Sequence, residues 1–205
     1  MSDRERAWKV LETRPIVEDR WMRLRADVCE TPSGQRIAPY YVLDYPDWVA
    51  IVAVTPEAKL VLVRQYRHGA GRVLLECVAG AIDPEDPDPA AAAARELKEE
   101  TGYSCDRMIP LGALYANPSM QANRMHSFLA LNARPESAQR LEAGEEGLTV
   151  ERLPIQSVLA GLGGGLIGQS MHVAAILLAL PHLTALGLVS PGAGEEGASE
   201  PDFAR

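Results

Sequence analysis

The segment WVAIVAVT at residues 48–55 is the feature that most restricts the fold. It is a continuous apolar run rich in β-branched residues, and such a run favours a strand that is buried on both faces. A sheet containing this strand needs a covering layer on each side. Strand patterns flank the segment, whereas helical patterns come in the middle and at the end of the chain. The order predicts an α/β fold, a mixed α/β sandwich rather than a regular series of βαβ units.

The expected elements divide the chain into three parts. Residues 20–28 alternate between apolar and charged side chains and, with RIAPYYVLDY after the turn TPSGQ, predict an N-terminal antiparallel β-hairpin. We expect residues 1–45 to carry these N-terminal strands, residues 46–189 to form the main domain, and residues 190–205 to form a flexible tail. In the main domain, further strands are expected at 60–67, 72–80, 108–115, 124–132 and 148–154, with helices at 88–101, 155–162 and 169–180.

Composition restricts the function classes. The 205 residues carry a net charge of −8 without a basic cluster, which argues against a nucleic-acid surface. Cys29, Cys77 and Cys105 form no CxxC pair, so neither a disulfide framework nor a zinc site is expected. The N-terminus lacks an apolar signal segment, and the apolar stretch near residues 172–189 is interrupted by polar residues and proline. We therefore expect a cytoplasmic protein without a membrane partner.

The segment DPAAAAARELKEETGY, residues 88–103, predicts a helix with an unusual charge pattern. Asp88 is a good N-cap, proline suits the first helical position, the alanines favour helix, and Gly102 ends it. Glu96, Glu99 and Glu100 fall on roughly one side, where like charges repel. Carboxylates at this spacing are typical ligands of Mg²⁺ or Mn²⁺. The alternative is a solvated charged face.

The segment GAIDPEDPDPAAAAARELKEETGY, residues 80–103, resembles the Nudix box, the signature of Nudix hydrolases. RELKEETG matches the family pattern arginine–glutamate–aliphatic–x–glutamate–glutamate–x–glycine at every specified place. The interval between Gly80 and Arg95 is one residue longer than usual, and either Glu85 or Asp86 takes the place of the loop glutamate. We interpret this difference as a loop insertion that leaves the helix unchanged.

The resemblance implies a Nudix-type α/β/α sandwich with a mixed sheet, and it implies a role for each residue of the box. Glu96 and Glu100 would bind the metal ions, with Glu99 as a third ligand and catalytic residue. The backbone carbonyl of Ala79 would also bind metal. Arg95 would orient the carboxylates, because its planar guanidinium makes bidentate charge-assisted hydrogen bonds.

The run VRQYRHGAGRVLLECVAGAID before the box resembles that of ADP-ribose and ADP-sugar pyrophosphatases, with Val78 where proline is usual. The resemblance implies that Arg67 contacts the substrate diphosphate, that Gln65 belongs to the same substrate-binding segment, and that Glu76 supports the metal cluster. The alternatives are a strand-end arginine and a surface glutamate.

Two segments after the box extend the resemblance. Pro118 stands where ADP-ribose-type members carry a proline, although an ordinary turn explains it equally well. A later loop glutamate serves as the catalytic base in such members, and LEAGEEGLTV offers Glu146 first and Glu145 second. A solvated acidic loop is the alternative.

We therefore expect a Mg²⁺-dependent pyrophosphohydrolase that cleaves ADP-ribose or a related ADP-sugar to AMP and a sugar phosphate. The alternatives are another nucleotide sugar or a dinucleotide, such as GDP-mannose, and a nucleotide sensor without turnover. The resemblance also implies a homodimer formed through the N-terminal strands. GLGGGLIG at 161–168 lacks the GK[ST] of a P-loop and indicates a linker, while His126 and His172 indicate packed or surface histidines rather than ligands.

Overall fold

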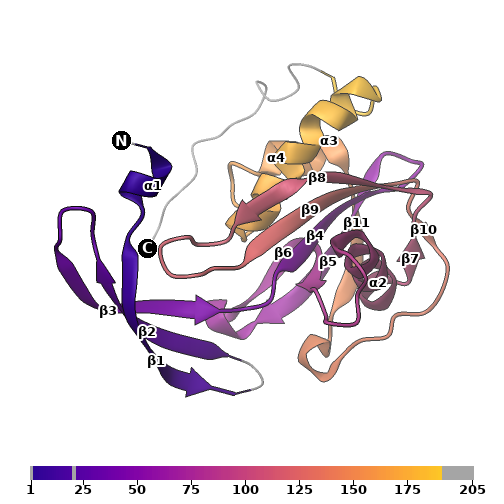
Figure 1. Cartoon of the computed structure of the whole chain (residues 1–205). Coiled ribbons are helices and arrows are strands. Elements are labelled where there is room, and N and C mark those ends of the chain that lie inside the picture. The colour runs from indigo at the N-terminus through magenta and orange to yellow at the C-terminus, as the bar shows by residue number, and fades with distance from the viewer. Residues whose placement is uncertain (1, 20–21, 191–205) are drawn as a thin grey trace. The chain divides into compact units, whose positions relative to one another are not determined.

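A computed structural model describes residues 2–19 and 22–190, so the tail expected at 190–205 lies almost wholly outside the described residues. The chain forms two compact units (Figure 1). The first consists of Met1–Asp47 and Leu114–Arg124, and the second of Trp48–Ala113 and Met125–Arg205.

The first unit contains a three-stranded antiparallel sheet where the sequence predicted a two-stranded hairpin. Its elements are α1 (Asp3–Arg6), β1 (Lys9–Glu18), β2 (Arg23–Glu30) and β3 (Arg36–Asp44), with the order β1-β2-β3. Strand β1 was missed because KVLETRPIVE has no clean alternation and contains Pro15. The strand is exposed along nearly all its length, and register shifts beside Val10 and Pro15 interrupt its pairing with β2. An edge strand of this kind tolerates proline.

Asp27 departs from the alternation expected for residues 20–28. Its side chain is buried, whereas the pattern placed it on the exposed side. The carboxylate accepts hydrogen bonds from Thr13 Oγ1 at 2.9 Å and from Arg25 Nε at 3.1 Å. A register shift between Asp27 and Cys29 also breaks the period of two. A buried charge needs such partners.

The second unit contains a six-stranded mixed sheet with the order β11-β5-β6-β4-β9-β8. The strands are β4 (Trp48–Val54), β5 (Lys59–Arg67), β6 (Arg72–Ala81), β8 (Arg107–Tyr115), β9 (Arg124–Leu131) and β11 (Thr149–Pro154). Two short strands, β7 (Tyr103–Ser104) and β10 (Arg134–Pro135), form a separate pair. Strands β4 and β9 run parallel to each other, whereas β5 pairs antiparallel with β11, β4 and β6, and β6 pairs antiparallel with β4.

Strand β6 changes its neighbour part-way along its length. Residues 72–77 pair with β5, and residues 78–81 pair with β4. Strands β4 and β5 pair directly only next to the turn that joins them, at residues 53–54 and 60–61. The two strands therefore diverge away from that turn, and β6 runs between them.

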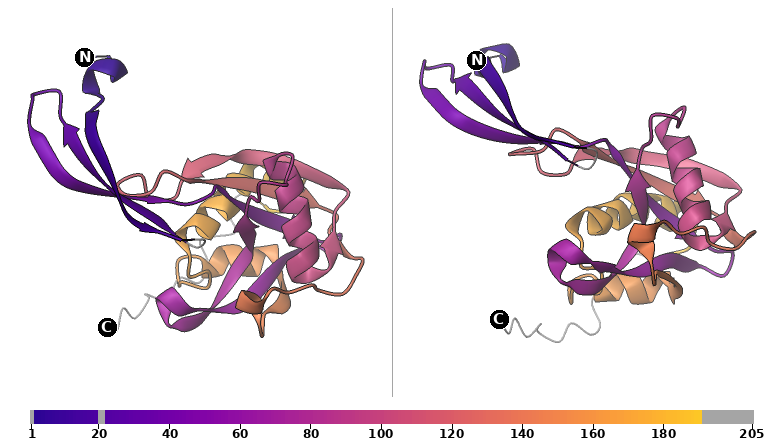
Figure 2. Two further views of the ribbon diagram at one scale, coloured as in Figure 1. Left: turned by 60° about the horizontal axis from the view of Figure 1, so that its bottom comes forward. Right: turned by 90° about the horizontal axis from the view of Figure 1, so that it is seen from below.

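Helices cover both faces of this sheet, as the buried strand predicted (Figure 2). Val49, Ile51 and Ala53 of β4 belong to the core cluster under α2 (Pro89–Thr101). Ala50, Val52 and Val54 belong to the cluster under α3 (Ile155–Gly161) and α4 (Ser170–Ala185). The fold is therefore a three-layer α/β/α sandwich.

Helix α2 begins and ends where the sequence predicts. The Asp88 side chain accepts a hydrogen bond from Ala91 N–H at 2.8 Å, and Pro89 occupies the first turn. Gly102 ends the helix with a φ of 73°, and a Cβ there would lie 2.1 Å from the Ser137 carbonyl oxygen. Glycine is required at this position for both reasons.

The glycine-rich segment 161–168 is a series of hydrogen-bonded turns between α3 and α4. A Cβ at Gly168 would lie 2.9 Å from Leu74 Cδ2, so this glycine allows the chain to approach β6 closely. Helix α4 continues past Pro181 to Ala185, beyond the predicted end at residue 180. Two short 3₁₀ helices, η1 (His68–Ala70) and η2 (Ala143–Glu145), complete the elements.

All three cysteines are free. Within the described residues, no helix is long and apolar enough to span a bilayer.

Candidate functional site

Three carboxylates converge beside the C-terminal half of α2. Glu96 and Glu100 lie one turn apart on the helix face that meets the sheet, and Glu145 comes from η2. One oxygen atom of each of these three carboxylates lies within 4.8 Å of the others. We call these residues the acidic cluster. Such a spacing suits a hard divalent cation bound by oxygen ligands.

Because Glu96 and Glu100 of the acidic cluster are buried, keeping their carboxylates charged costs free energy unless a cation is present. The Glu100 side chain is only 1% exposed, and burial, with the charges of Glu96 and Glu145, raises its pKa to about 9. Burial raises the pKa of Glu96 to about 7, although the neighbouring Arg95 opposes that shift. Buried like charges are stabilised when an opposite charge lies between them. The residues present therefore fit a divalent metal ion.

Arg95 binds the loop and the helix together. Its guanidinium donates to both Asp86 carboxylate oxygens at 3.1 and 2.8 Å, and to the Ala81 carbonyl oxygen at 3.0 Å. It also donates to Glu96 at 2.8 Å and to Glu99 at 3.1 Å. The hydrogen bond from Arg95 lowers the pKa of Asp86. Asp86 thus occupies the position at which the sequence left a choice between two acids, and Glu85 is exposed.

Glu99 lies outside the acidic cluster. One of its carboxylate oxygens accepts from Arg95 and the other from Arg140 at 2.5 Å. The Arg140 backbone N–H also donates to the Glu99 carbonyl oxygen at 2.8 Å, and Gln139 Nε2 donates to the Glu100 carbonyl oxygen. The loop that leads to Glu145 is therefore fixed to the end of α2. Its arginine and glutamine had no signal in the sequence, because the contact joins distant segments.

Gly80 leaves room for the carboxylate of Glu96. A Cβ at this position would lie 2.1 Å from Glu96 Oε1. The Ala79 backbone N–H, next along the strand, donates to Glu100 Oε2 at 3.3 Å. The end of β6 therefore positions two carboxylates of the acidic cluster. A role of the Ala79 carbonyl in metal binding stays a prediction.

Gly80→Ala is expected to weaken Mg²⁺ binding without unfolding the protein. The added methyl group overlaps the far end of a flexible side chain, so it displaces the Glu96 carboxylate rather than the backbone. Loss of ligand orientation of this kind costs roughly 10- to 100-fold in metal affinity. Calorimetric titration with Mn²⁺ and Mg²⁺ would measure the change. Gly163→Ala, which adds its methyl group in open space, is the matched control; equal affinities in the two variants would contradict the prediction.

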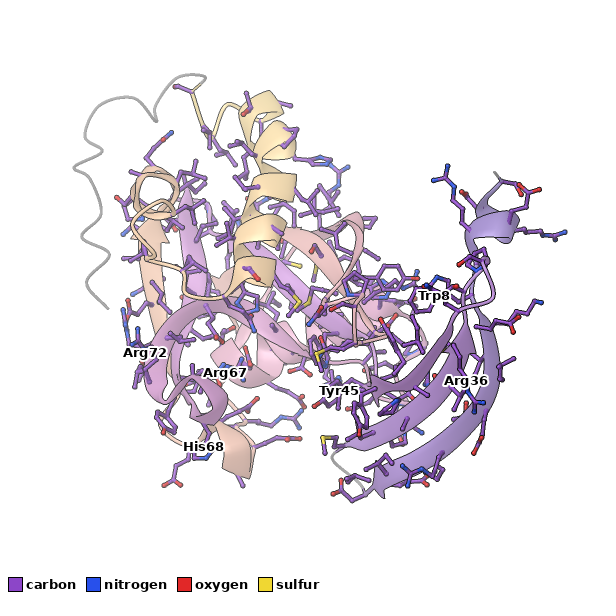
Figure 3. All side chains as sticks on the ribbon, turned by 90° about the vertical axis from the view of Figure 1, so that its left-hand side faces the viewer. Trp8, Arg36, Tyr45, Arg67, His68 and Arg72 are labelled. Atoms are coloured by element: carbon purple, nitrogen blue, oxygen red, sulfur yellow. The ribbon has the colours of Figure 1, made fainter. Side chains whose placement is uncertain are left out.

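A second charged group lies at the hairpin of β5 and β6. Arg67 donates to Glu76 Oε2 through Nε at 2.9 Å and through a terminal nitrogen at 2.7 Å. Gln65 Nε2 lies 3.4 Å from the same oxygen. Glu76 is completely buried, while 39% of the Arg67 side chain is exposed. Figure 3 shows Arg67 with His68 and Arg72 where β5 turns into β6. Glu76 therefore holds the guanidinium, and Gln65 supports Glu76.

Two predicted residues are not part of these groups. Glu146 is exposed and follows η2, so the cluster contains its neighbour Glu145. Pro118 belongs to the first unit, in a turn closed by a hydrogen bond from Met120 N–H to the Asn117 carbonyl. Its role in substrate binding stays a prediction.

Comparison with models of known families shows the family to which the chain belongs. The profile described as NUDIX domain matches residues 44–165, which is more than half of the chain and includes the whole acidic cluster. The chain belongs to the Nudix family. A profile described as nucleoside diphosphate sugar hydrolase N-terminal domain matches residues 8–43. The chain is thus a Nudix hydrolase with its three-stranded sheet in that second region.

Named relatives agree with this assignment. A methanol dehydrogenase activator of Bacillus methanolicus is 33% identical over 67% of this chain and 74% of its own. An ADP-ribose pyrophosphatase of Mycobacterium tuberculosis is 30% identical over 82% of this chain and 80% of its own. The crystal structure of an ADP compounds hydrolase superposes with a TM-score of 0.78 at 27% identity, covering 89% of this chain and 97% of that one.

Proposed function

We propose that this Nudix hydrolase cleaves the diphosphate of ADP-ribose or a related ADP-sugar, releasing AMP and a sugar phosphate. The acidic cluster of Glu96, Glu100 and Glu145 is the observation that carries the proposal. Similarity to an ADP-ribose pyrophosphatase over most of the chain supports the substrate class.

Within the acidic cluster, Glu96 and Glu100 would hold Mg²⁺ or Mn²⁺, which would neutralise the negative charge on the diphosphate oxygens. Glu96 and Glu100 are the fixed ligands, because both come from a capped helix packed on the sheet. Arg95 keeps the Glu96 carboxylate in place. Each carboxylate thus has a defined orientation before substrate arrives, which limits reorganisation during the reaction.

Arg67 and Glu145 would act on the reacting groups. The exposed part of the Arg67 guanidinium is available to a phosphate oxygen, while Glu76 restrains the other edge. Glu145 Oε2 accepts a hydrogen bond from Glu142 N–H at 2.9 Å, which orients the carboxylate. We assign to Glu145 the removal of a proton from the attacking water, which is general base catalysis.

A substrate panel tests this proposal. Purified protein is incubated with ADP-ribose, ADP-glucose, GDP-mannose and diadenosine diphosphate, each with Mg²⁺, Mn²⁺ or EDTA, and the products are separated by ion-exchange chromatography. AMP and ribose 5-phosphate are expected from ADP-ribose, and none with EDTA. Faster release of GMP from GDP-mannose would replace the ADP-sugar assignment, and binding without any product would favour the sensor.

We also propose that two copies of the chain associate through the first unit. Strand β1 is an edge strand, and Trp8, Val10, Leu11 and Ile16 expose apolar side chains on or beside it. Such an edge favours pairing with another chain. Light scattering should give twice the mass of 22.2 kDa, and a monomer would contradict the proposal.

A further inference from the structure

A cavity of about 360 Å³ lies in the second unit, on the face of the sheet that α4 covers. Trp48, Ala81 and Met125 line it from three adjacent strands, since Trp48 pairs with both of the others in register. Arg67 lines it from β5, and Gln169 and His172 from the beginning of α4. A cavity that combines apolar walls with a few polar side chains is typical of a small-molecule site.

The two polar residues of α4 have unsatisfied atoms. Among the described residues, Gln169 Oε1 and His172 Nδ1 are buried without a hydrogen-bond partner. His172 is only 1% exposed. An unpaired buried polar atom is costly, and most such atoms in folded proteins have partners. Both residues line the cavity, so a molecule bound there would lie next to them.

The stability of helix α4 does not explain why Gln169 and His172 stand at its start. Gln169 occupies the N-cap of α4, yet its side chain makes no capping hydrogen bond. Serine, threonine, aspartate or asparagine would stabilise this end better. Gly168 brings the chain against Leu74 of β6 and so places the N-cap residue next to the sheet. A helix that needed only packing would not require glutamine and a buried histidine here.

Apart from Arg67, the polar residues that line the cavity do not suit a phosphate. Burial, together with the positive charge of Arg67, lowers the pKa of His172 to about 3, so the imidazole is neutral at physiological pH. The Gln169 oxygen is an acceptor and would repel a phosphate oxygen. A hydroxyl group both donates and accepts, so it suits the amide oxygen and either tautomer of a neutral imidazole.

The position of the cavity selects which part of a substrate can enter. Ala79, Gly80 and Ala81 form one wall, and the same segment contacts Glu96 and Glu100 of the acidic cluster. The cavity and the acidic cluster therefore share the end of β6, which places a group in the cavity next to the diphosphate of the proposed substrate. In a nucleoside diphosphate sugar that group is a sugar ring on either side, because the base is one ring further away.

We infer that this cavity is a sugar subsite, in which Gln169 and His172 hydrogen-bond the hydroxyl groups of a ribose attached to the diphosphate while Trp48 packs against the ring. The inference rests on the proposed function. Substrates with different sugars should then bind with different affinities, according to how their hydroxyl groups meet these two residues. Gln169 and His172 are specificity-determining residues that take no part in the chemical step.

Binding of α,β-methylene-ADP-ribose, which cannot be hydrolysed at the bridging position, tests the inference by calorimetry in Mg²⁺. Gln169→Leu should weaken binding about tenfold or more, because a ribose hydroxyl loses its partner. Gln156→Leu, on the exposed face of α3, makes the same chemical change away from the cavity and should bind like wild type. His172→Asn is a second variant, used only where its thermal unfolding matches wild type.

Deoxy analogues identify which ribose is bound. One analogue lacks the 2-hydroxyl of the adenosine ribose and the other lacks that of the terminal ribose. The analogue that alters the ribose in the cavity should bind wild type more weakly, and the same change should have little effect on binding to Gln169→Leu. Equal affinities of wild type and Gln169→Leu, or no wild-type binding, would overturn the subsite. AMP release by wild type and Gln156→Leu separately tests the proposed function. If wild type releases AMP but Gln169→Leu binds the analogue as tightly as wild type, only the subsite is refuted. If Gln169→Leu binds more weakly but wild type releases no AMP, only the hydrolase function is refuted.

Discussion

Glu100→Gln is expected to lower metal-dependent kcat by about 1,000-fold or more while the protein stays folded. The amide is nearly isosteric and can still accept the hydrogen bond from Ala79 N–H, but it carries no charge for a divalent cation. Metal ions contribute several kcal/mol to such reactions, and each 1.36 kcal/mol corresponds to a tenfold change in rate. The rate of AMP formation from ADP-ribose at saturating Mg²⁺ measures the effect.

A matched control separates the loss of a ligand from the loss of a surface charge. Glu136→Gln removes a carboxylate whose ion pair with Lys98 is half-exposed, so kcat should change less than twofold. If Glu100→Gln retained more than a tenth of wild-type turnover, the acidic cluster would not be the metal site.

The same substitution should stabilise the metal-free protein at alkaline pH. Because the folded-state pKa of Glu100 is raised to about 9, well above that of the unfolded chain, folded Glu100 keeps a proton that the unfolded chain releases. The free energy of unfolding then falls as pH rises from about 4.5 to about 9. Glutamine removes this dependence, so in EDTA at pH 8 the variant should be at least about 1 kcal/mol more stable than wild type. Urea unfolding at pH 5 and pH 8 measures the difference, and a lower stability of the variant at pH 8 would contradict it.

The sequence predicted the parts of the fold whose signal is local. WVAIVAVT gave a strand buried on both faces, and Asp88 with Gly102 gave the limits of α2, because buried runs and helix caps depend on neighbouring residues. Strand β1 was not predicted, since KVLETRPIVE forms a strand only by pairing with β2. The end of α4 was placed before Pro181, because propensity alone does not include the packing of Leu183 in the core.

The site shows the same division. Their spacing on one helix grouped Glu96, Glu99 and Glu100, and the structure places the first and third of them, but not Glu99, in the acidic cluster. Arg140, Gln139 and the choice of Asp86 as partner of Arg95 depend on contacts between segments that only the folded chain brings together. Gln169 and His172 lacked a motif, because their relation to the site arises from the close approach of Gly168 to β6.

The two loop glutamates provide the sharpest comparison between sequence and geometry. The resemblance favoured Glu146 as the base and put Glu145 second, whereas the acidic cluster contains Glu145. Both follow the segment that Gln139 and Arg140 fix to the end of α2, so the loop is held equally for either residue. They differ in direction: Glu145 is half-buried beside Glu96 and Glu100, and Glu146 is exposed. A base must reach the proton that it removes.

Glu145→Gln is therefore expected to lower kcat by about 10²- to 10⁴-fold, and Glu146→Gln by less than about threefold. The fold should survive in both, because glutamine at 145 can still accept the hydrogen bond from Glu142 N–H that closes η2. Single-turnover rates with ADP-ribose and Mg²⁺, measured from pH 5 to pH 9, separate a lost base from a lost metal ligand. Loss of the base removes the rise of the rate with pH at any Mg²⁺ concentration, whereas loss of a ligand is partly restored by more Mg²⁺. A larger defect in Glu146→Gln would mean that the loop rearranges when substrate binds and that the family resemblance, not the acidic cluster, identifies the base.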